Sequence, residues 1–223
     1  MMSSSSTPPV RILLVEDHAV FRQALALAFS MQPNFEVVGE AGSVAEARAL
    51  LDGIDVGVFD LDLPDGSGAT LIKELHERNR RAEVLVLTAS VRETDHARAV
   101  EAGAAGLVHK RTPLNEIVEA VQRVGRGESL ISRRELIDLV QLAGKQREQE
   151  LATQQIIDRL TPRERDVLTA LGEGLSDREI ADRLFISKDT VHTHMVNMMG
   201  KLDVDSRMQA LIFAVKSGLV TLE

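Results

Sequence analysis

Short apolar runs alternate with helical patterns through the first half of this sequence, and this alternation limits the folds that the chain can adopt. The runs are residues 11–15, 35–39, 56–60, 84–87 and 106–109, and each precedes apolar residues at helical spacing. Five strands alternating with five helices over roughly 115 residues predict a doubly wound parallel sheet with right-handed crossovers. The short length, and the lack of a G-x-G-x-x-G turn after the first strand, favour a flavodoxin-like sheet with strand order 2-1-3-4-5.

The helices between these strands are placed by local start and stop signals. Ser43 and Glu46 form a capping-box pattern, Gly103 ends a helical segment, and Thr112 followed by Pro113 is typical of a helix start. Helices are therefore predicted at 19–29, at 43–51, at 69–79, up to Gly103 and at 113–124.

The second half of the chain has a different character. Residues 128–159 are charged and rich in Gln, which predicts a largely helical linker, although Gly144 weakens the case for one continuous helix. Residues 160–223 contain four short helical patterns, which predict a small all-α domain with a helix-turn-helix at 176–195. The predicted organisation is a disordered N-terminus at 1–9, an α/β domain at 10–127, the linker, and the helical domain.

Composition limits the environment and the partners of the chain. Its 223 residues include no Cys, and no apolar run approaches the ~20 residues of a membrane span. The Ser- and Pro-rich start lacks the apolar core of a signal peptide, so we expect a cytoplasmic protein without membrane contact. The formal charge of -8 would by itself argue against nucleic-acid binding.

Polar residues stand at the carboxyl ends of four predicted strands, which meet at one crevice in a 2-1-3-4-5 sheet. Carboxylates gathered there would repel one another unless a hard cation such as Mg²⁺ bound them. A hydroxyl and an ammonium group would complete a pocket for a phosphoryl group, and Asp60 is the natural nucleophile. These residues are Glu16, Asp17, Asp60, Thr88 and Lys110.

Simpler explanations exist for each of these residues alone. Asp62 could be a solvated loop acid, Thr88 a helix N-cap and Lys110 an exposed charge, but together they would require coincidence at four strand ends. The Asp-x-Asp at 60–62 also occurs in phosphatases with an aspartyl nucleophile. Those enzymes place it after their first strand and add a cap region, whereas here it follows the third, so we expect a protein that is not an enzyme.

The motifs at 15–18, 59–64, 87–89 and 106–110 resemble those of response-regulator receiver domains. The resemblance implies that a sensor histidine kinase phosphorylates Asp60. It also implies that Glu16, Asp17, Asp60 and the backbone carbonyl of Asp62 hold Mg²⁺, while Thr88 and Lys110 contact the phosphoryl group.

Two positions depart from the family pattern. Leu107 stands where the family usually has a Tyr or Phe that rotates as a switch, and two residues separate Lys110 from Pro113, which usually follows the Lys directly. We expect the phosphorylation chemistry to survive both changes. Without a ring at residue 107, we expect output to depend on repacked apolar contacts around the fourth helix and fifth strand.

Two helices joined by a tight turn at 186–187 fit a DNA-binding helix-turn-helix. An ordinary helical bundle without DNA binding is the alternative. The net charge favours this alternative, because residues 160–223 contain eight Lys and Arg against ten Asp and Glu, a charge of -2. In the second helix, an apolar stripe predicts the side that faces the core. The stripe consists of Val191, Met195, Met198 and Leu202.

Motifs within residues 160–202 closely resemble the LuxR-type helix-turn-helix, and a receiver with this module is the plan of the NarL/FixJ family of response regulators. The resemblance implies a recognition helix at 188–202. His192, Thr193 and Val196 would face base edges, with Asn197 at the border, while Lys188, Thr190, Lys201 and Arg207 would hold phosphates. The family often has Lys in place of His192, so a single module is expected to bind weakly.

The sequence therefore predicts a two-component response regulator that controls transcription. Phosphorylation of Asp60 would promote homodimerisation and binding to double-stranded, palindromic DNA, and RNA polymerase is a further candidate partner. The alternative is a receiver protein whose C-terminal domain mainly dimerises or contacts another protein.

Overall fold

The computed structural model describes residues 8–219, so most of the N-terminal stretch expected to be disordered lies outside the described part. The chain divides into two compact units, Met1–Gly144 and Lys145–Glu223. Within residues 8–219, none of the helices combines the length and the apolar character needed to cross a membrane.

The first unit is built on a parallel sheet of five strands in the order β2-β1-β3-β6-β7, which is the order predicted from the sequence. Its central strand, β3, is buried along its whole length, as expected for a sheet covered on both faces. The strands are β1 (Val10–Val15), β2 (Phe35–Ala41), β3 (Val56–Asp60), β6 (Glu83–Thr88) and β7 (Gly106–His109).

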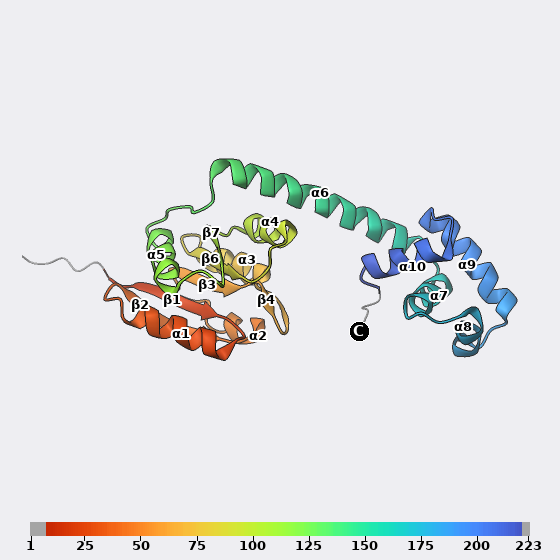
Figure 1. Ribbon diagram of the computed structural model, residues 1–223, viewed down its shortest axis with the longest axis horizontal. Coiled ribbons are helices and arrows are strands. Elements are labelled where there is room, and N and C mark those ends of the chain that lie inside the picture. Colours follow the sequence, from red (N-terminus) through yellow and green to blue (C-terminus); the bar gives the residue numbers. More distant parts are fainter. Residues whose placement is uncertain (1–7, 220–223) are drawn as a thin grey trace, which may run out of the picture. The chain divides into compact units, whose positions relative to one another are not determined.

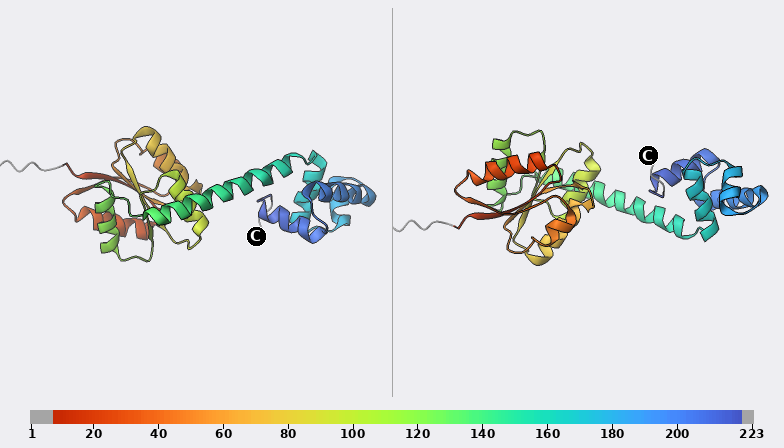
Figure 2. Two further views of the ribbon diagram at one scale, coloured as in Figure 1. Left: turned by 90° about the horizontal axis from the view of Figure 1, so that it is seen from above. Right: turned by 90° about the horizontal axis from the view of Figure 1, so that it is seen from below.

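Helices cover both faces of this sheet, as Figures 1 and 2 show. Side chains alternate along each strand, so β1 sends Ile12 and Leu14 to one face and Leu13 and Val15 to the other. Helices α1 (Ala19–Ser30) and α5 (Leu114–Val124) pack on the Ile12 face, and α2 (Val44–Arg48), α3 (Gly68–Arg78) and α4 (Glu93–Ala102) pack on the Leu13 face.

Helix α2 is shorter than the predicted 43–51. The backbone N–H groups of Ala49 and Leu50 bond to carbonyls only three residues earlier, at 3.3 and 2.9 Å, so the helix tightens and stops. Its N-terminus is fixed from outside, because the Asp65 carboxylate accepts hydrogen bonds from the amides of Val44 and Ala45 at 2.7 and 2.9 Å. A sequence pattern does not reveal a cap supplied from 20 residues away.

A short hairpin, β4 (Asp62–Leu63) and β5 (Gly66–Ser67), follows Asp60 where the sequence predicted only a turn. The chain then enters α3 at Gly68, whose amide donates to the Leu61 carbonyl at 3.0 Å. A Cβ atom at Gly68 would stand 1.9 Å from the Asp60 carbonyl oxygen. The absence of a side chain at Gly68 therefore lets α3 begin directly against the strand end that carries Asp60.

A single helix, α6 (Arg133–Asp158), occupies most of the predicted linker and continues through Gly144. Its first half belongs to the first unit. There Leu139 and Ala143 form a small buried cluster with Ala97 and Val100 of α4. The start of the linker segment is thus packed on the receiver-like unit instead of running free.

The second unit consists of α7 (Pro162–Gly172), α8 (Asp177–Leu184), α9 (Lys188–Leu202) and α10 (Arg207–Lys216). Each helix begins at a Ser or Thr whose side chain accepts a backbone N–H, as the sequence predicted. The predicted stripe of α9 is buried in the shared core. Helix α8 ends at Leu184, earlier than expected, because Phe185 adopts a left-handed conformation with φ 56°.

Two Gly→Ala substitutions test how closely the backbone is packed at Asp60. Gly68→Ala should destabilise the fold by roughly 2 kcal/mol or more, because the new methyl group meets the Asp60 carbonyl and the backbone must move. Gly144→Ala is the matched control, since nothing lies within 4 Å of its Cβ position and the site is helical. It should stabilise the fold by about 0.5–1 kcal/mol.

Urea unfolding followed by circular dichroism measures both effects. A Gly68→Ala protein as stable as the wild type would show that the close approach to Asp60 is not required.

Candidate functional site

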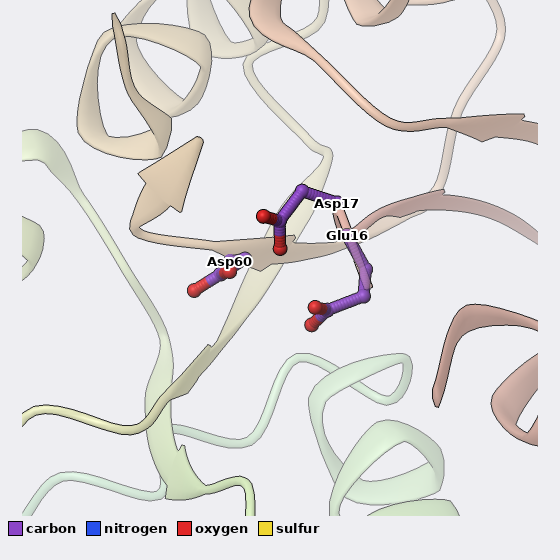
Figure 3. Close-up of side chains that lie close together, drawn as sticks. All are labelled: Glu16, Asp17 and Asp60. Atoms are coloured by element: carbon purple, nitrogen blue, oxygen red, sulfur yellow. The ribbon is translucent and has the colours of Figure 1, made fainter. Parts of the chain in front are cut away.

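Three carboxylates meet at the carboxyl edge of the sheet. Glu16 and Asp17 directly follow β1, and Asp60 is the last residue of β3, the strand beside it. One oxygen from each lies within 4.8 Å of the others, and Figure 3 shows the three groups gathered there. Glu16 and Asp60 are 1% and 2% exposed, whereas Asp17 faces solvent.

Lys110 places its ammonium group among these carboxylates. Its Nζ lies 2.6 Å from Asp60 Oδ2 and 2.7 Å from Glu16. The position follows from the sheet, because the Lys110 amide continues the β6–β7 pairing by donating to the Thr88 carbonyl at 2.9 Å. The Nζ also stands 6.0 Å from the centre of the Phe21 ring, a neighbour that the sequence did not suggest.

Thr88 and Asp62 complete the surroundings of Asp60. Thr88 is buried at the end of β6, and its hydroxyl oxygen accepts a hydrogen bond from the Ser90 amide at 3.0 Å. The Asp62 amide donates to Asp60 Oδ1 at 3.2 Å. Both oxygens of Asp60 therefore have defined partners, one from Lys110 and one from the backbone of Asp62.

Burial dominates the electrostatics of the buried pair of acids. It raises the pKa of Asp60 and of Glu16 above their ordinary values, although hydrogen bonds from Lys110 act in the opposite direction. Burial acts to lower the pKa of Lys110, but its hydrogen bonds to Asp60 and Glu16 outweigh that effect and raise it. The site thus holds one firmly protonated ammonium against two carboxylates that are costly to keep charged.

The residues present fit a divalent cation. Glu16, Asp17 and Asp60 each offer a carboxylate oxygen to one small volume, and Lys110 is the cation that contacts both Glu16 and Asp60 there. Carboxylate oxygens are preferred ligands of hard cations, and three carboxylates exceed the single charge that Lys110 supplies. An added positive charge would therefore relieve repulsion within the cluster.

Leu107 lies beside the contact between α4 and α6. It is partly buried and packs against the cluster that joins α4 to the first half of α6. The apolar surface of the fourth helix and fifth strand, expected to repack on signalling, is therefore already in contact with the chain's own α6.

On the second unit, the predicted recognition residues share one exposed side of α9. His192, Thr193, Val196 and Asn197 are exposed, while the intervening stripe is buried. At the start of the helix, the Ser187 hydroxyl accepts the Thr190 amide at 3.1 Å, and Lys188 is exposed. The helix thus presents a polar face of the composition expected for groove contact.

Lys201 and Arg207, also predicted as phosphate contacts, are engaged within the unit. Lys201 Nζ lies 2.7 Å from Glu164, which is 4% exposed and belongs to the N-terminal capping box of α7. Arg207 is hydrogen-bonded to Asp177 and donates to the Leu175 carbonyl at 2.7 Å. Sequence analysis missed both pairings because the partners are 30 or more residues apart.

Comparisons with known proteins match both units. The family described as "Response regulator receiver domain" matches residues 12–122, and the family described as "Bacterial regulatory proteins, luxR family" matches residues 158–214. The "DNA-binding transcriptional activator DevR/DosR" of Mycobacterium tuberculosis is 38% identical over 93% of this chain and 94% of the relative. The "Nitrate/nitrite response regulator protein NarL" of Escherichia coli is 31% identical over 94% of this chain and 96% of the relative.

A solved structure agrees with these matches for the first unit. The signal receiver domain of the putative response regulator NarL from Mycobacterium tuberculosis is similar over 55% of this chain and 100% of that chain, with 30% identity and a TM-score of 0.52.

The raised pKa values predict how the stability of the metal-free protein depends on pH. The folded chain holds protons on Asp60 and Glu16 more tightly than the unfolded chain, so the two groups oppose folding at pH 7. This cost should fall as the pH drops through the raised pKa values toward the ordinary values near 4. In EDTA, Asp60→Asn should therefore gain stability over the wild type, more at pH 7 than at pH 4, near the ordinary pKa, by about 1.4 kcal/mol per unit of pKa difference.

Asp65→Asn is the matched control with the opposite sign. Hydrogen bonds from the Ala45 and Val44 amides lower the pKa of Asp65, so its substitution should destabilise the fold at pH 7. Urea unfolding at the two pH values measures all three proteins. Equal stability of Asp60→Asn and wild type at both pH values would contradict the assigned cost of the buried charge.

Proposed function

Because the chain belongs to the family of response regulators that join a receiver domain to a LuxR-type DNA-binding domain, we propose that a sensor histidine kinase phosphorylates it on Asp60. The observation that carries the proposal is the position of Asp60, which is buried at a strand end with Lys110 Nζ 2.6 Å away. An ammonium group at that distance can neutralise charge on a phosphoryl group attached to the carboxylate.

In the proposed reaction, the protein mainly positions the Asp60 carboxylate and neutralises charge on the phosphoryl group. A carboxylate oxygen of Asp60 attacks phosphorus, the O–P bond forms, and the P–N bond to the kinase histidine breaks and leaves a neutral imidazole after protonation. Mg²⁺, held by Glu16, Asp17, Asp60 and the Asp62 backbone carbonyl, would supply charge neutralisation. Lys110 keeps its positive charge throughout, since its pKa is raised.

A continuous set of contacts leads from the site toward α6. The Thr88 hydroxyl holds the Ser90 amide, and the Ser90 hydroxyl donates to Asp95 of α4 at 2.6 Å. When Thr88 turns toward a phosphoryl group, its bond to Ser90 must change, and α4 is the next element in line. Because α4 packs against α6 through Ala97 and Val100, we propose that the signal reaches the linker helix through this contact.

We propose that the face formed by α1 and α5 pairs two copies of the chain. Val20, Leu27 and Met31 of this face are 72%, 65% and 74% exposed, and beside them lies an open groove of about 740 Å³. The groove is lined by both acidic and basic residues, so a second copy related by two-fold symmetry can match opposite charges. These charged residues are Glu119 and Arg126, together with Arg123 and Glu128, which pair with each other at 3.0 Å.

Pairing would matter for DNA binding because a single module has little charge to contribute. Residues 160–223 carry eight basic against ten acidic residues, and five of the basic ones, Lys201 and Arg207 among them, form ion pairs within the second unit. Little affinity can therefore come from counterion release by one module. Two linked modules on one palindrome can add ~10² to 10⁴ in avidity.

We therefore expect the phosphorylated dimer to be the DNA-binding form and the regulator of transcription, with RNA polymerase as a further candidate partner. A cytoplasmic location is expected because the proposed target is DNA. A C-terminal domain that only dimerises or contacts protein is the competing function, which the acidic charge favours. Gel shifts on palindromic duplexes separate the two.

Asp60→Asn should abolish Mg²⁺-dependent phosphorylation by a histidine kinase or acetyl phosphate, because an amide is a poor nucleophile. Asp62→Asn is the matched control. Asp62 is exposed, and the proposal uses only its backbone, so this variant should still be phosphorylated. Base-labile label on both variants, measured by mass spectrometry of the intact protein, would rule out Asp60 as the acceptor.

Met31→Lys should weaken dimerisation of the phosphorylated protein by about tenfold or more, because the exposed apolar surface of the pairing face gains a desolvated charge. Labelling of Asp60 should be unchanged. Ile137→Lys is the control, since Ile137 is 49% exposed on α6, away from α1 and α5. Sedimentation velocity measures both, and a loss of dimer in Ile137→Lys alone would assign the pairing to α6 instead.

A further inference from the structure

Phe185 combines two features that a folded domain normally avoids. Its side chain is 95% exposed, and its backbone has a φ of 56°. A bulky side chain in the left-handed region is strained, and Gly or Asn usually occupies this position after a helix. The backbone of Phe185 ends α8, because its amide donates a hydrogen bond to the Ala181 carbonyl. The Phe185 ring takes no part in this hydrogen bond.

The ring stands at the turn into the proposed recognition helix. Ser187, two residues later, caps α9 and hydrogen-bonds Thr190. Lys188 in the first turn of α9 is exposed. The N-terminal end of a recognition helix is the part that enters the major groove, so its preceding turn lies at the groove edge.

The surroundings favour a nucleic-acid partner over a protein one. A stable protein interface needs about 800 Å² from each partner, whereas one aromatic ring supplies about 150–250 Å². Lys188, three residues after Phe185, is exposed, and Arg183, two residues before it, is exposed and paired with Glu173. A single exposed ring beside Lys188 is of a size suited to packing against the sugars of one DNA strand.

We propose that Phe185 is an additional DNA-contact residue, whose ring packs against the sugar–phosphate backbone at the edge of the groove that α9 enters. The proposal rests on the proposed DNA binding and extends it to a residue outside the recognition helix. The contact is apolar and independent of base sequence, so it adds affinity without adding charge.

The experiment compares full-length phosphorylated proteins on the duplex that the wild type selects from sheared genomic DNA. Phe185→Asn and Phe185→Gly should weaken binding by roughly fivefold to tenfold, the effect of exposing about 50 Å² of apolar surface. The dependence of affinity on salt should keep its slope, because Phe185 carries no charge. Calorimetry should show melting temperatures at or above the wild-type value, by up to roughly 4 °C, since both residues relieve the strained φ.

Two further variants distinguish failure of the Phe185 contact from failure of the proposed DNA binding. Phe185→Tyr keeps both the ring and the strain, so it should bind like the wild type. Lys188→Ala should flatten the salt slope by about one unit if the module binds DNA as proposed.

Wild-type affinity of Phe185→Asn and Phe185→Gly beside a weakened Lys188→Ala would overturn the Phe185 contact alone. A loss in Phe185→Tyr equal to that in Phe185→Asn would also overturn it. Unchanged duplex binding with loss of transcription in a purified system would assign the ring to a protein partner. A wild-type protein that retains no duplex would instead refute the proposed DNA binding, and this contact with it.

Discussion

The interaction between the Lys110 ammonium group and two buried carboxylates is the one on which the candidate site depends. Asp60 and Glu16 are almost fully buried, and burial alone would favour their neutral forms. Lys110 contacts both, at 2.6 and 2.7 Å, and is itself fixed by strand pairing with Thr88. One positive charge, on Lys110, therefore lies between two negative charges, on Asp60 and Glu16. Binding of a cation or a phosphoryl group would change the net charge of this cluster.

From this site, contacts within the first unit lead to the first half of α6. Thr88, Ser90 and Asp95 connect the end of β6 to α4 by hydrogen bonds, and α4 shares a buried cluster with α6. The partly buried Leu107 packs on the same cluster. At residue 107, this chain has an aliphatic side chain in place of a ring that rotates between two positions. This side chain already packs against the cluster that α6 forms with α4.

Much of this arrangement could be predicted from sequence, because strand order, strand ends and helix caps depend on local patterns. The strand order and the caps at Thr161, Ser176, Ser187 and Ser206 are confirmed. What could not be predicted depends on contacts between distant residues. No periodic pattern in the sequence indicates three of these contacts: the cap that Asp65 provides to α2, the Glu164–Lys201 pair and the packing of α6 on α4. The helix α6 continues through Gly144, since one glycine costs a helix only about 1 kcal/mol.

We propose that phosphorylation of Asp60 converts two weakly binding modules into one tightly binding dimer. The most direct test is the affinity of the full-length protein for its selected duplex, with and without phosphorylation, at ~0.15 M salt, where surface charges are screened beyond ~8 Å. Phosphorylation should tighten binding by ~10² to 10⁴, the range expected for linked sites. Equal affinity of the phosphorylated and unphosphorylated proteins would contradict it.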